Sequence, residues 1–279
     1  MWLCVPSRTT TTIVRLYPAS NSRLPTGAGI VTAATIVLIP GLMNDGWVWT
    51  GQLGSLSRMG PVYVACNDGL TTLADMADRI LETTQGPLIA VGHSMGGRVA
   101  LEMIARAPDR VIALALVSTG AHGARETEAA SRQTLVDLAI TDGMTAVARA
   151  WMPGMMSAST PEETRRAIQA MIERADAKVF AGQQHALLNR PDRLRFVASL
   201  CLPTLIVTGD ADTWASPTQH EELAHAISGS RLEIVEVAGH MLPAEAPDAL
   251  TTLLHAFILE NLQAQQSSED ANFASIGTE

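Results

Sequence analysis

The sequence has little cysteine, and it lacks the long apolar runs that membrane proteins need. Cys4, Cys66 and Cys201 are widely spaced and include no Cys-x-x-Cys pair. This odd, scattered set argues against a disulfide framework and favours reduced thiols in a reducing compartment, with Cys66 and Cys201 as buried filler. The longest apolar run, residues 27–43, is interrupted by threonine, proline and glycine. It falls short of the roughly 20 residues of a membrane helix, so no membrane partner is predicted.

Positive charge is scarce as well. The 19 Lys and Arg residues face 28 Asp and Glu, and the formal net charge is −9. This balance argues against nucleic acid or an anionic membrane as the main partner. The first residues lack the positive segment and long apolar core of a signal peptide, so we expect a cytoplasmic protein.

The motifs of the common cofactors are missing. There is no Walker loop, and no Gly-x-Gly-x-x-Gly follows a strand pattern, so no nucleotide cofactor is predicted. His220 and His225 resemble a zincin pair, but they are one residue too far apart to share a helix face. The sequence therefore predicts neither a cofactor nor a metal, and it says nothing about the oligomeric state.

What the chain does have is a serine in a strand–turn–helix setting. An apolar run at residues 88–91 reads as a buried strand, and it is followed by Gly92-His93-Ser94-Met95-Gly96 and a helical pattern at 98–106. This is the Gly-x-Ser-x-Gly arrangement of a nucleophile elbow, in which crowding around the turn requires the glycines. The pattern favours Ser94 as a nucleophile over the alternative of a structural glycine-rich turn.

The rest of the chain alternates strand and helix patterns, which predicts a mostly parallel sheet covered on both faces. The predicted strands are 11–17, 35–39, 61–66, 88–91, 111–117, 204–208 and 232–237. The predicted helices of this alternation are 47–58, 71–84, 98–106, 217–227 and 247–262. Between 121 and 195 only helical patterns occur, so we expect a core of residues 1–120 and 196–262 with a helical insertion at 121–195. The polar tail, 263–279, is predicted to be disordered.

A serine nucleophile needs a base and a group that orients the base. In a parallel sheet these partners are expected just beyond the carboxyl ends of later strands. Asp210 and Asp212 follow the strand at 204–208, and His240 follows the strand at 232–237. The order Ser94, acid, His240 is that of an α/β-hydrolase triad. The other histidines at 220, 225 and 255 lie on predicted helices and are expected at the surface.

With these motifs together, the chain resembles an α/β-hydrolase-fold enzyme of the capped serine esterase and lactonase group. The matching pieces are Pro-Gly-Leu at 40–42, Gly-His-Ser-Met-Gly-Gly at 92–97, Gly-Asp-Ala-Asp at 209–212, and Gly-His-Met at 239–241 with Glu245 and Pro247 beyond. The resemblance implies that Asp212 is the acid, with Asp210 as the alternative. It also implies an oxyanion hole formed by the amides of Met95 and Leu42, and a cap formed by residues 121–195. Where such families often have His-Gly, this chain has Pro40-Gly41, so the loop loses a hydrogen-bonding side chain.

The expected activity is hydrolysis of a small to medium, largely apolar carboxylic ester or lactone through an acyl-enzyme. Methionines and Trp151 in the 121–195 segment are typical of an adaptable apolar pocket, although each of them alone is more typical of core packing. His122 and His185 are further candidates for substrate contact. Carbon–carbon bond hydrolysis, perhydrolysis, acyl transfer and a non-catalytic ligand receptor on the same fold stay open, because the fold alone does not fix the function.

Overall fold

The computed structural model describes the backbone of residues 34–276 and the side chains of residues 34–267. Six parallel strands form one sheet in the order β2-β1-β3-β4-β5-β6. Their bounds are β1 Thr35–Ile39, β2 Val62–Val64, β3 Leu88–His93, β4 Val111–Val117, β5 Thr204–Gly209 and β6 Arg231–Val235. The predicted strand at 11–17 lies outside the described residues. The fold is the α/β-hydrolase fold that the sequence predicted.

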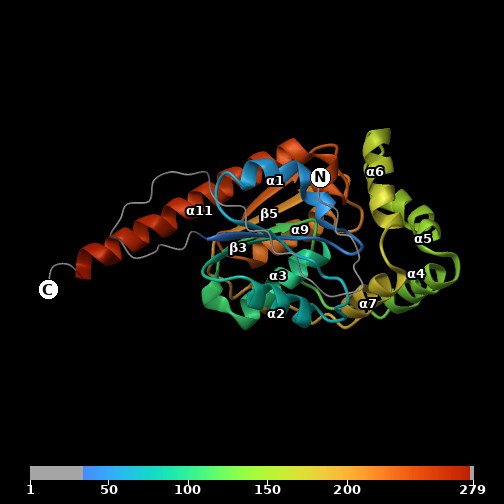
Figure 1. Ribbon diagram of the computed structural model, residues 1–279, viewed down its shortest axis with the longest axis horizontal. Helices are drawn as coiled ribbons and strands as arrows, with labels where there is room; N and C mark the ends of the chain where they lie inside the picture. The colour runs from blue at the N-terminus through green and yellow to red at the C-terminus, as the bar shows by residue number, and fades with distance from the viewer. Residues whose placement is uncertain (1–33, 277–279) are drawn as a thin grey trace.

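The central strands are buried on both sides, as the parallel arrangement requires. Every residue of β1, β3 and β5 is buried, and β4 exposes only part of Ile112. The sheet is covered by η1 (Gly46–Trp49), α1 (Thr50–Leu56), α2 (Leu73–Thr83), α3 (Met95–Arg106), η2 (Pro108–Arg110), α8 (Leu194–Val197), α9 (Pro217–Ala226), α10 (Leu242–Glu245) and α11 (Pro247–Ile276). Figure 1 shows α1 and α11 along one side of the sheet and α2 and α3 along the other.

Local sequence signals explain where several helices begin. Helix α2 starts after Thr72, whose hydroxyl accepts a hydrogen bond from the amide of Asp75 at 3.0 Å. Helix α9 starts with Pro217, after the cap Ser216. Helix α11 continues to Ile276, so the polar segment that we expected to be disordered is helical up to that residue. The physical reason is that extending an existing helix through residues of good helix propensity needs no new nucleus.

Between β4 and β5 the chain leaves the sheet and forms the helices that the sequence predicted. We call residues 121–195 the helical insertion; it contains α4 (Glu128–Asp142), α5 (Met144–Trp151), η3 (Met152–Gly154), α6 (Glu162–Glu173) and α7 (Ala177–Leu188). Figure 1 shows these four α-helices gathered beyond one end of the sheet. Pro161 occupies the N-cap position of α6.

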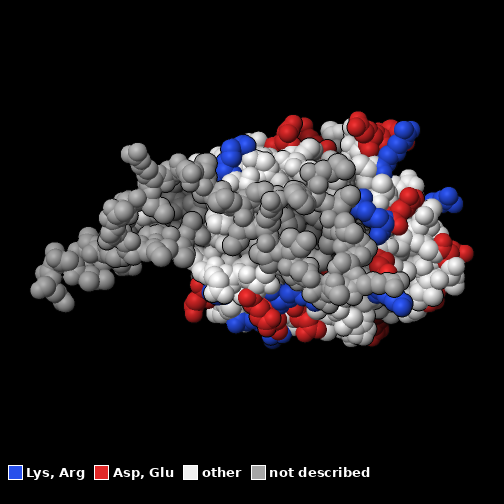
Figure 2. All heavy atoms as spheres, in the orientation of Figure 1, with Lys and Arg blue, Asp and Glu red and all other residues white. Residues whose placement is uncertain are grey.

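The surface carries both signs of charge. On the face in Figure 2, acidic and basic side chains are mixed around the edge of the described part of the molecule. Within residues 34–276, none of the helices combines the length and the apolar character that crossing a bilayer requires.

Candidate active site

Ser94 follows directly after strand β3, in a strained turn. Ser94 has φ of +54° and ψ of −116°, a conformation that residues with a Cβ rarely adopt. Its amide donates to the carbonyl of Val117 at 2.9 Å, and Thr119 Oγ1 donates to its carbonyl at 2.6 Å. These two bonds fix the turn to the end of β4 and hold the serine hydroxyl beyond the edge of the sheet.

The glycines on either side are required by close backbone approach. A Cβ on Gly92 would lie 2.4 Å from the carbonyl oxygen of Gly96, and one on Gly96 would lie 2.1 Å from that of Ile39. Neither distance is possible for a real side chain, so both positions need glycine. The sequence pattern predicted this crowding.

The ends of β3, β5 and β6 bring together the three side chains that the sequence singled out. Ser94 Oγ lies 2.9 Å from Nε2 of His240, and Nδ1 of His240 lies 3.0 and 3.1 Å from the two carboxylate oxygens of Asp212. An Nδ1–H that donates to Asp212 leaves Nε2 free to accept the serine proton. The arrangement is a continuous chain of hydrogen bonds from carboxylate to hydroxyl.

Asp212 is held as an anion in a nearly buried position. Burial raises the pKa of this carboxyl, but the neighbouring His240 and the amides of Ala215 and Trp214 outweigh burial and hold the pKa below its usual value. The two amides donate to Asp212 Oδ1 at 2.8 and 3.0 Å. Asp210, the alternative acid, is exposed, and its Oδ1 accepts from the amide of Ala238 at 3.3 Å.

A second histidine, next to Ser94, was not singled out from the sequence. His93 is fully buried, its Nε2–H donates to the carbonyl of His240 at 2.8 Å, and its Nδ1 accepts from Asn44 Nδ2 at 3.1 Å. Burial and, after it, the proximity of His240 lower the pKa of His93 to about 3. His93 is therefore a neutral linker between the loop after β1 and the loop that carries His240.

The loop after β1 lies against Ser94. A Cβ on Gly41 would be 3.1 Å from Cβ of Ser94. Among the described residues, no protein acceptor is found for the amides of Leu42 and Met95, the two donors expected for an oxyanion hole. The amide of Met43, whose φ is +61°, donates instead to Oε1 of Gln183 on α7 at 2.8 Å. The loop was expected to lose a hydrogen-bonding side chain because it has Pro40. Gln183 and Asn44 provide other side-chain hydrogen bonds that hold this loop.

The helical insertion contributes aromatic side chains to a cluster beside His240. Trp151 stacks on Trp214, with ring centroids 4.7 Å apart, and also meets Phe180 edge-on at 6.0 Å. The ring of Trp214 in turn lies 5.2 Å from that of His240. Trp214 escaped the sequence reasoning because it lies in the loop after Asp212, outside every periodic pattern.

His220 is a correction to the surface location predicted for the remaining histidines. It is completely buried, its Nδ1–H donates to the carbonyl of Ser216 at 3.0 Å, and its Nε2 accepts from the amide of Thr119 at 3.0 Å. Burial lowers its pKa. His225 and His255 are exposed, as predicted.

One other expectation, that of two buried cysteines, fails. Cys201, expected to be buried filler, is exposed, while Cys66 is half-buried. His185, a candidate for substrate contact, is exposed and lies against Asn189. Among the described residues, no group of three or more His, Cys, Asp or Glu side chains could hold a metal ion.

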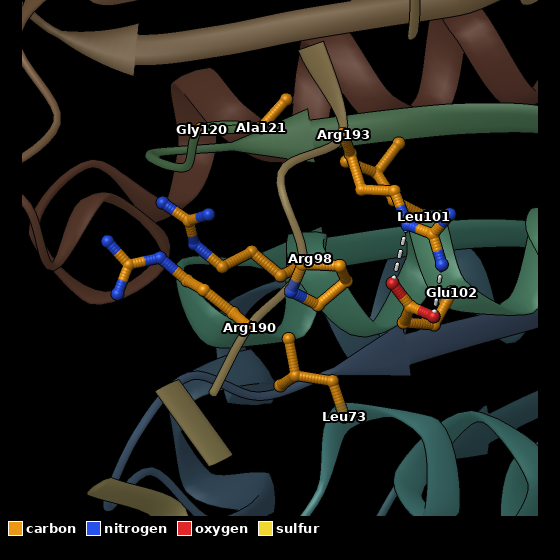
Figure 3. Close-up of a pocket in the computed structure, with 9 residues that line it drawn as sticks. Leu73, Arg98, Leu101, Glu102, Gly120, Ala121, Arg190 and Arg193 are labelled. Carbon is orange, nitrogen blue, oxygen red and sulfur yellow. Dashed lines mark hydrogen bonds and ion pairs between the residues drawn. The ribbon is translucent and has the colours of Figure 1, made fainter. Parts of the chain in front are cut away.

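His122, the other candidate, joins a cluster of arginines at the base of the insertion. Arg98 donates to the carbonyl of His122 at 2.6 Å, and burial followed by the charge of Arg98 lowers the pKa of His122 to about 4. Figure 3 shows Arg98 and Arg190 beside the Arg193–Glu102 ion pair, whose nitrogen–oxygen distances are 2.8 and 2.6 Å. The cavity among them, about 10 Å³, holds one water at most. This cluster ties the insertion to α3 and leaves no room for a substrate.

The chain is similar to known hydrolases in sequence. The sequence model of the alpha/beta hydrolase family matches residues 36–253. A Cronobacter sakazakii protein whose name describes it as a carbamate hydrolase, RutD, is 28% identical over 247 residues, covering 80% of this chain and 90% of its own length.

Two solved structures share the fold. A thermophilic esterase from Thermogutta terrifontis superposes with a TM-score of 0.77 at 25% identity, covering 82% of this chain and 91% of its own. The enol-lactonase from Burkholderia xenovorans LB400 has a TM-score of 0.71 at 26% identity, with coverages of 88% and 95%. The chain is thus similar to hydrolases of esters, lactones and carbamates.

Proposed function

Because the chain belongs to the alpha/beta hydrolase family, we propose that it is a serine hydrolase that cleaves a small to medium, largely apolar carboxylic ester or lactone. The observation that carries the proposal is the hydrogen-bonded chain from Asp212 through His240 to Ser94. The similarity to an esterase and an enol-lactonase supports the substrate class.

The reaction follows from the positions of these groups. His240 accepts the proton of Ser94 at Nε2 as the serine oxygen attacks the substrate carbonyl, while Asp212 stabilises the imidazolium and holds its tautomer. The amides of Leu42 and Met95 donate to the oxyanion. His240 then protonates the leaving alkoxide oxygen and an acyl-enzyme remains; the alcohol departs from an ester, whereas in a lactone it stays attached to the acyl group. A water molecule, deprotonated by His240, releases the acid and restores the hydroxyl of Ser94.

The helical insertion, residues 121–195, acts in this proposal as the cap over the site. Its Trp151 and Phe180, together with Trp214 from the core, form an apolar wall close to the base. Such a wall favours an uncharged acyl or alcohol group over a charged one, because a charge placed there would lose its hydration. The small-molecule substrate is therefore expected to be largely apolar.

Replacing the nucleophile tests the proposal. Ser94→Ala should lower kcat by roughly 10⁴–10⁶-fold on a panel of p-nitrophenyl esters of graded chain length, lactones and aryl carbamates. Ser199→Ala, which removes an exposed hydroxyl from the same core, is the matched control and should keep wild-type rates. Unchanged turnover in Ser94→Ala would reject the proposal. Wild-type protein that binds panel compounds without turning them over would instead favour a ligand receptor.

A further inference from the structure

Glu245, at the end of the short helix α10, makes an unusual number of hydrogen bonds for a partly exposed carboxylate. Its Oε1 accepts from the amide of Met241 at 2.9 Å, and its Oε2 accepts from the amide of Gly239 at 3.1 Å. These two amides belong to the residues on either side of His240. The carboxylate therefore closes the loop that carries the base.

The same carboxylate also reaches the helical insertion. Oε2 accepts from the amide of Ser157 at 2.8 Å and from the hydroxyl of Thr160 at 2.6 Å. Hydrogen bonds to an ionised acceptor are roughly twice as strong as those between neutral groups. One side chain thus joins the base loop to a segment of the insertion, residues 155–160, that lies more than 80 positions away in the sequence.

The main chain around His240 shows that the contact is close. The amide of His240 donates to the carbonyl of Met155 at 2.9 Å. A Cβ on Gly239 would lie 2.5 Å from the amide nitrogen of Ser157, so backbone packs directly on backbone at this point. A shift of the 155–160 segment would therefore move the main chain of His240.

We propose that Glu245 is a positioning residue for the general base: it locks residues 155–160 of the helical insertion onto the loop of His240, so that the base reaches Ser94 only when the insertion is seated. This inference rests on the proposed function and adds a residue that touches none of the reacting atoms. Glu245 acts through the main chain of Gly239 and Met241, while His93 donates to the carbonyl of His240.

The test compares Glu245→Ala, Glu245→Gln and Thr160→Val by steady-state kinetics on the best p-nitrophenyl ester. Reactive sites are counted by labelling Ser94 to completion with a fluorophosphonate, so that kcat is expressed per active site. Because a displacement of about 1 Å costs on the order of 10²-fold, we expect Glu245→Ala to lower kcat by roughly 10–100-fold, with KM changed less than about twofold. Glu245→Gln keeps one acceptor oxygen and should recover part of that loss.

Thr160→Val removes only the hydroxyl on the insertion and should lower kcat by a smaller factor. In the double variant with Glu245→Ala, it should cause no further loss, because both changes break the same link. Asp248→Asn, an exposed carboxylate three residues along the chain, is the matched control and should keep the wild-type kcat.

Two results would overturn the inference. One is a wild-type kcat per labelled site in Glu245→Ala, even with a lowered melting temperature, since Glu245 would then only stabilise the fold. The other is an additive loss in the double variant, which would separate Glu245 from the insertion. If Glu245→Ala does not fold, wild-type kcat in Thr160→Val overturns the inference instead. Activity retained by Ser94→Ala rejects the proposed function itself, so the two failures are distinguishable.

Discussion

The carboxyl edge of the sheet and the helical insertion make different contributions to the candidate site. The sheet presents the three proposed catalytic side chains: Ser94 and Asp212 lie close after the ends of β3 and β5, and His240 lies in the loop between β6 and α10. The insertion presents none of them, yet it contacts the loops after β1, β5 and β6. Gln183 accepts from the amide of Met43, and Trp151 stacks on Trp214. The carbonyl of Met155 accepts from the amide of His240. In our proposal, the sheet supplies the chemistry and the insertion supplies its alignment.

This difference matters because alignment and reactivity fail in different ways. Removing a reactive group abolishes a chemical step, whereas loosening its support lowers the fraction of molecules in the productive geometry. Variants of the two regions should therefore separate by the size of their effects.

The largest effect is expected on the sheet side, from Asp212→Asn. The amide cannot stabilise the imidazolium and favours the wrong tautomer, so kcat should fall by about 10⁴-fold. Asp210→Asn, two residues away and exposed, should stay within about twofold of wild type in the same ester assay. Equal losses of kcat in the two variants would show that Asp212 is not the residue that orients His240.

The next effect comes from the contact between the insertion and the base loop. In Gly239→Ala the new Cβ meets the amide nitrogen of Ser157, so the two segments must separate, and kcat should fall by about 10²-fold. Gly54→Ala in α1 meets open space and should keep full activity, with stability raised by up to about 1 kcal/mol. Wild-type rates in Gly239→Ala would show that the sheet alone aligns the base.

A smaller effect is expected where the insertion holds the loop after β1. Gln183→Leu leaves the buried amide of Met43 without its acceptor, which should cost about 1–3 kcal/mol of unfolding free energy and lower kcat less than Gly239→Ala does. The neighbouring Gln184 accepts from Arg132, away from this loop, so Gln184→Leu should lose stability with kcat intact. Urea unfolding measures the loss of stability in each variant, and steady-state kinetics on the ester measures the change in kcat.

The effect that changes least at neutral pH concerns the pH dependence of stability. His93 has a pKa of about 3 in the folded protein against 6.5 in the unfolded chain, so below pH 6.5 the unfolded state binds a proton that the native state does not. This stabilisation is complete above pH 6.5 and is lost as the pH falls towards 3. The unfolding free energy should drop by about 1.4 kcal/mol per pH unit from this residue.

The variant His93→Gln removes that contribution. Between pH 6 and 4.5 its stability should fall less steeply than that of the wild type by about 1.4 kcal/mol per pH unit, because His122 and His220 contribute equally to both proteins. Urea unfolding at four pH values provides the measurement. Parallel slopes would mean that His93 takes up a proton in the folded state.

Local sequence patterns were enough to predict most of the fold. The strand at Val111–Val117 coincides with β4, and the Gly-x-Ser-x-Gly turn lies between β3 and α3. These elements are specified by the residues within them: continuous β-branched and apolar runs for buried strands, and glycines where backbones touch. The last predicted strand, 232–237, was displaced because Val237 has φ of +62° and leaves the sheet, so β6 ends at Val235.

The features that the sequence did not reveal depend on distant partners. His220 lies on an ordinary helical pattern, and only the amide of Thr119, 101 residues earlier, explains why it is buried. The contact of Met155 with His240 uses a carbonyl that every residue has, so no residue type could signal it. Glu245 was identified as one residue of the pattern that resembles the α/β-hydrolase family, but its hydrogen bonds to Ser157 and Thr160 could not be predicted from the sequence.

One consequence follows from the contact at residues 154–157. Gly154 accepts from Thr213 Oγ1, Met155 accepts from His240, and Ser157 donates to Glu245, all through peptide groups of the insertion. Peptide groups persist when side chains are exchanged. Exchanges of the side chains at 155 and 157 should therefore leave these main-chain hydrogen bonds to the loops of Asp212 and His240 in place.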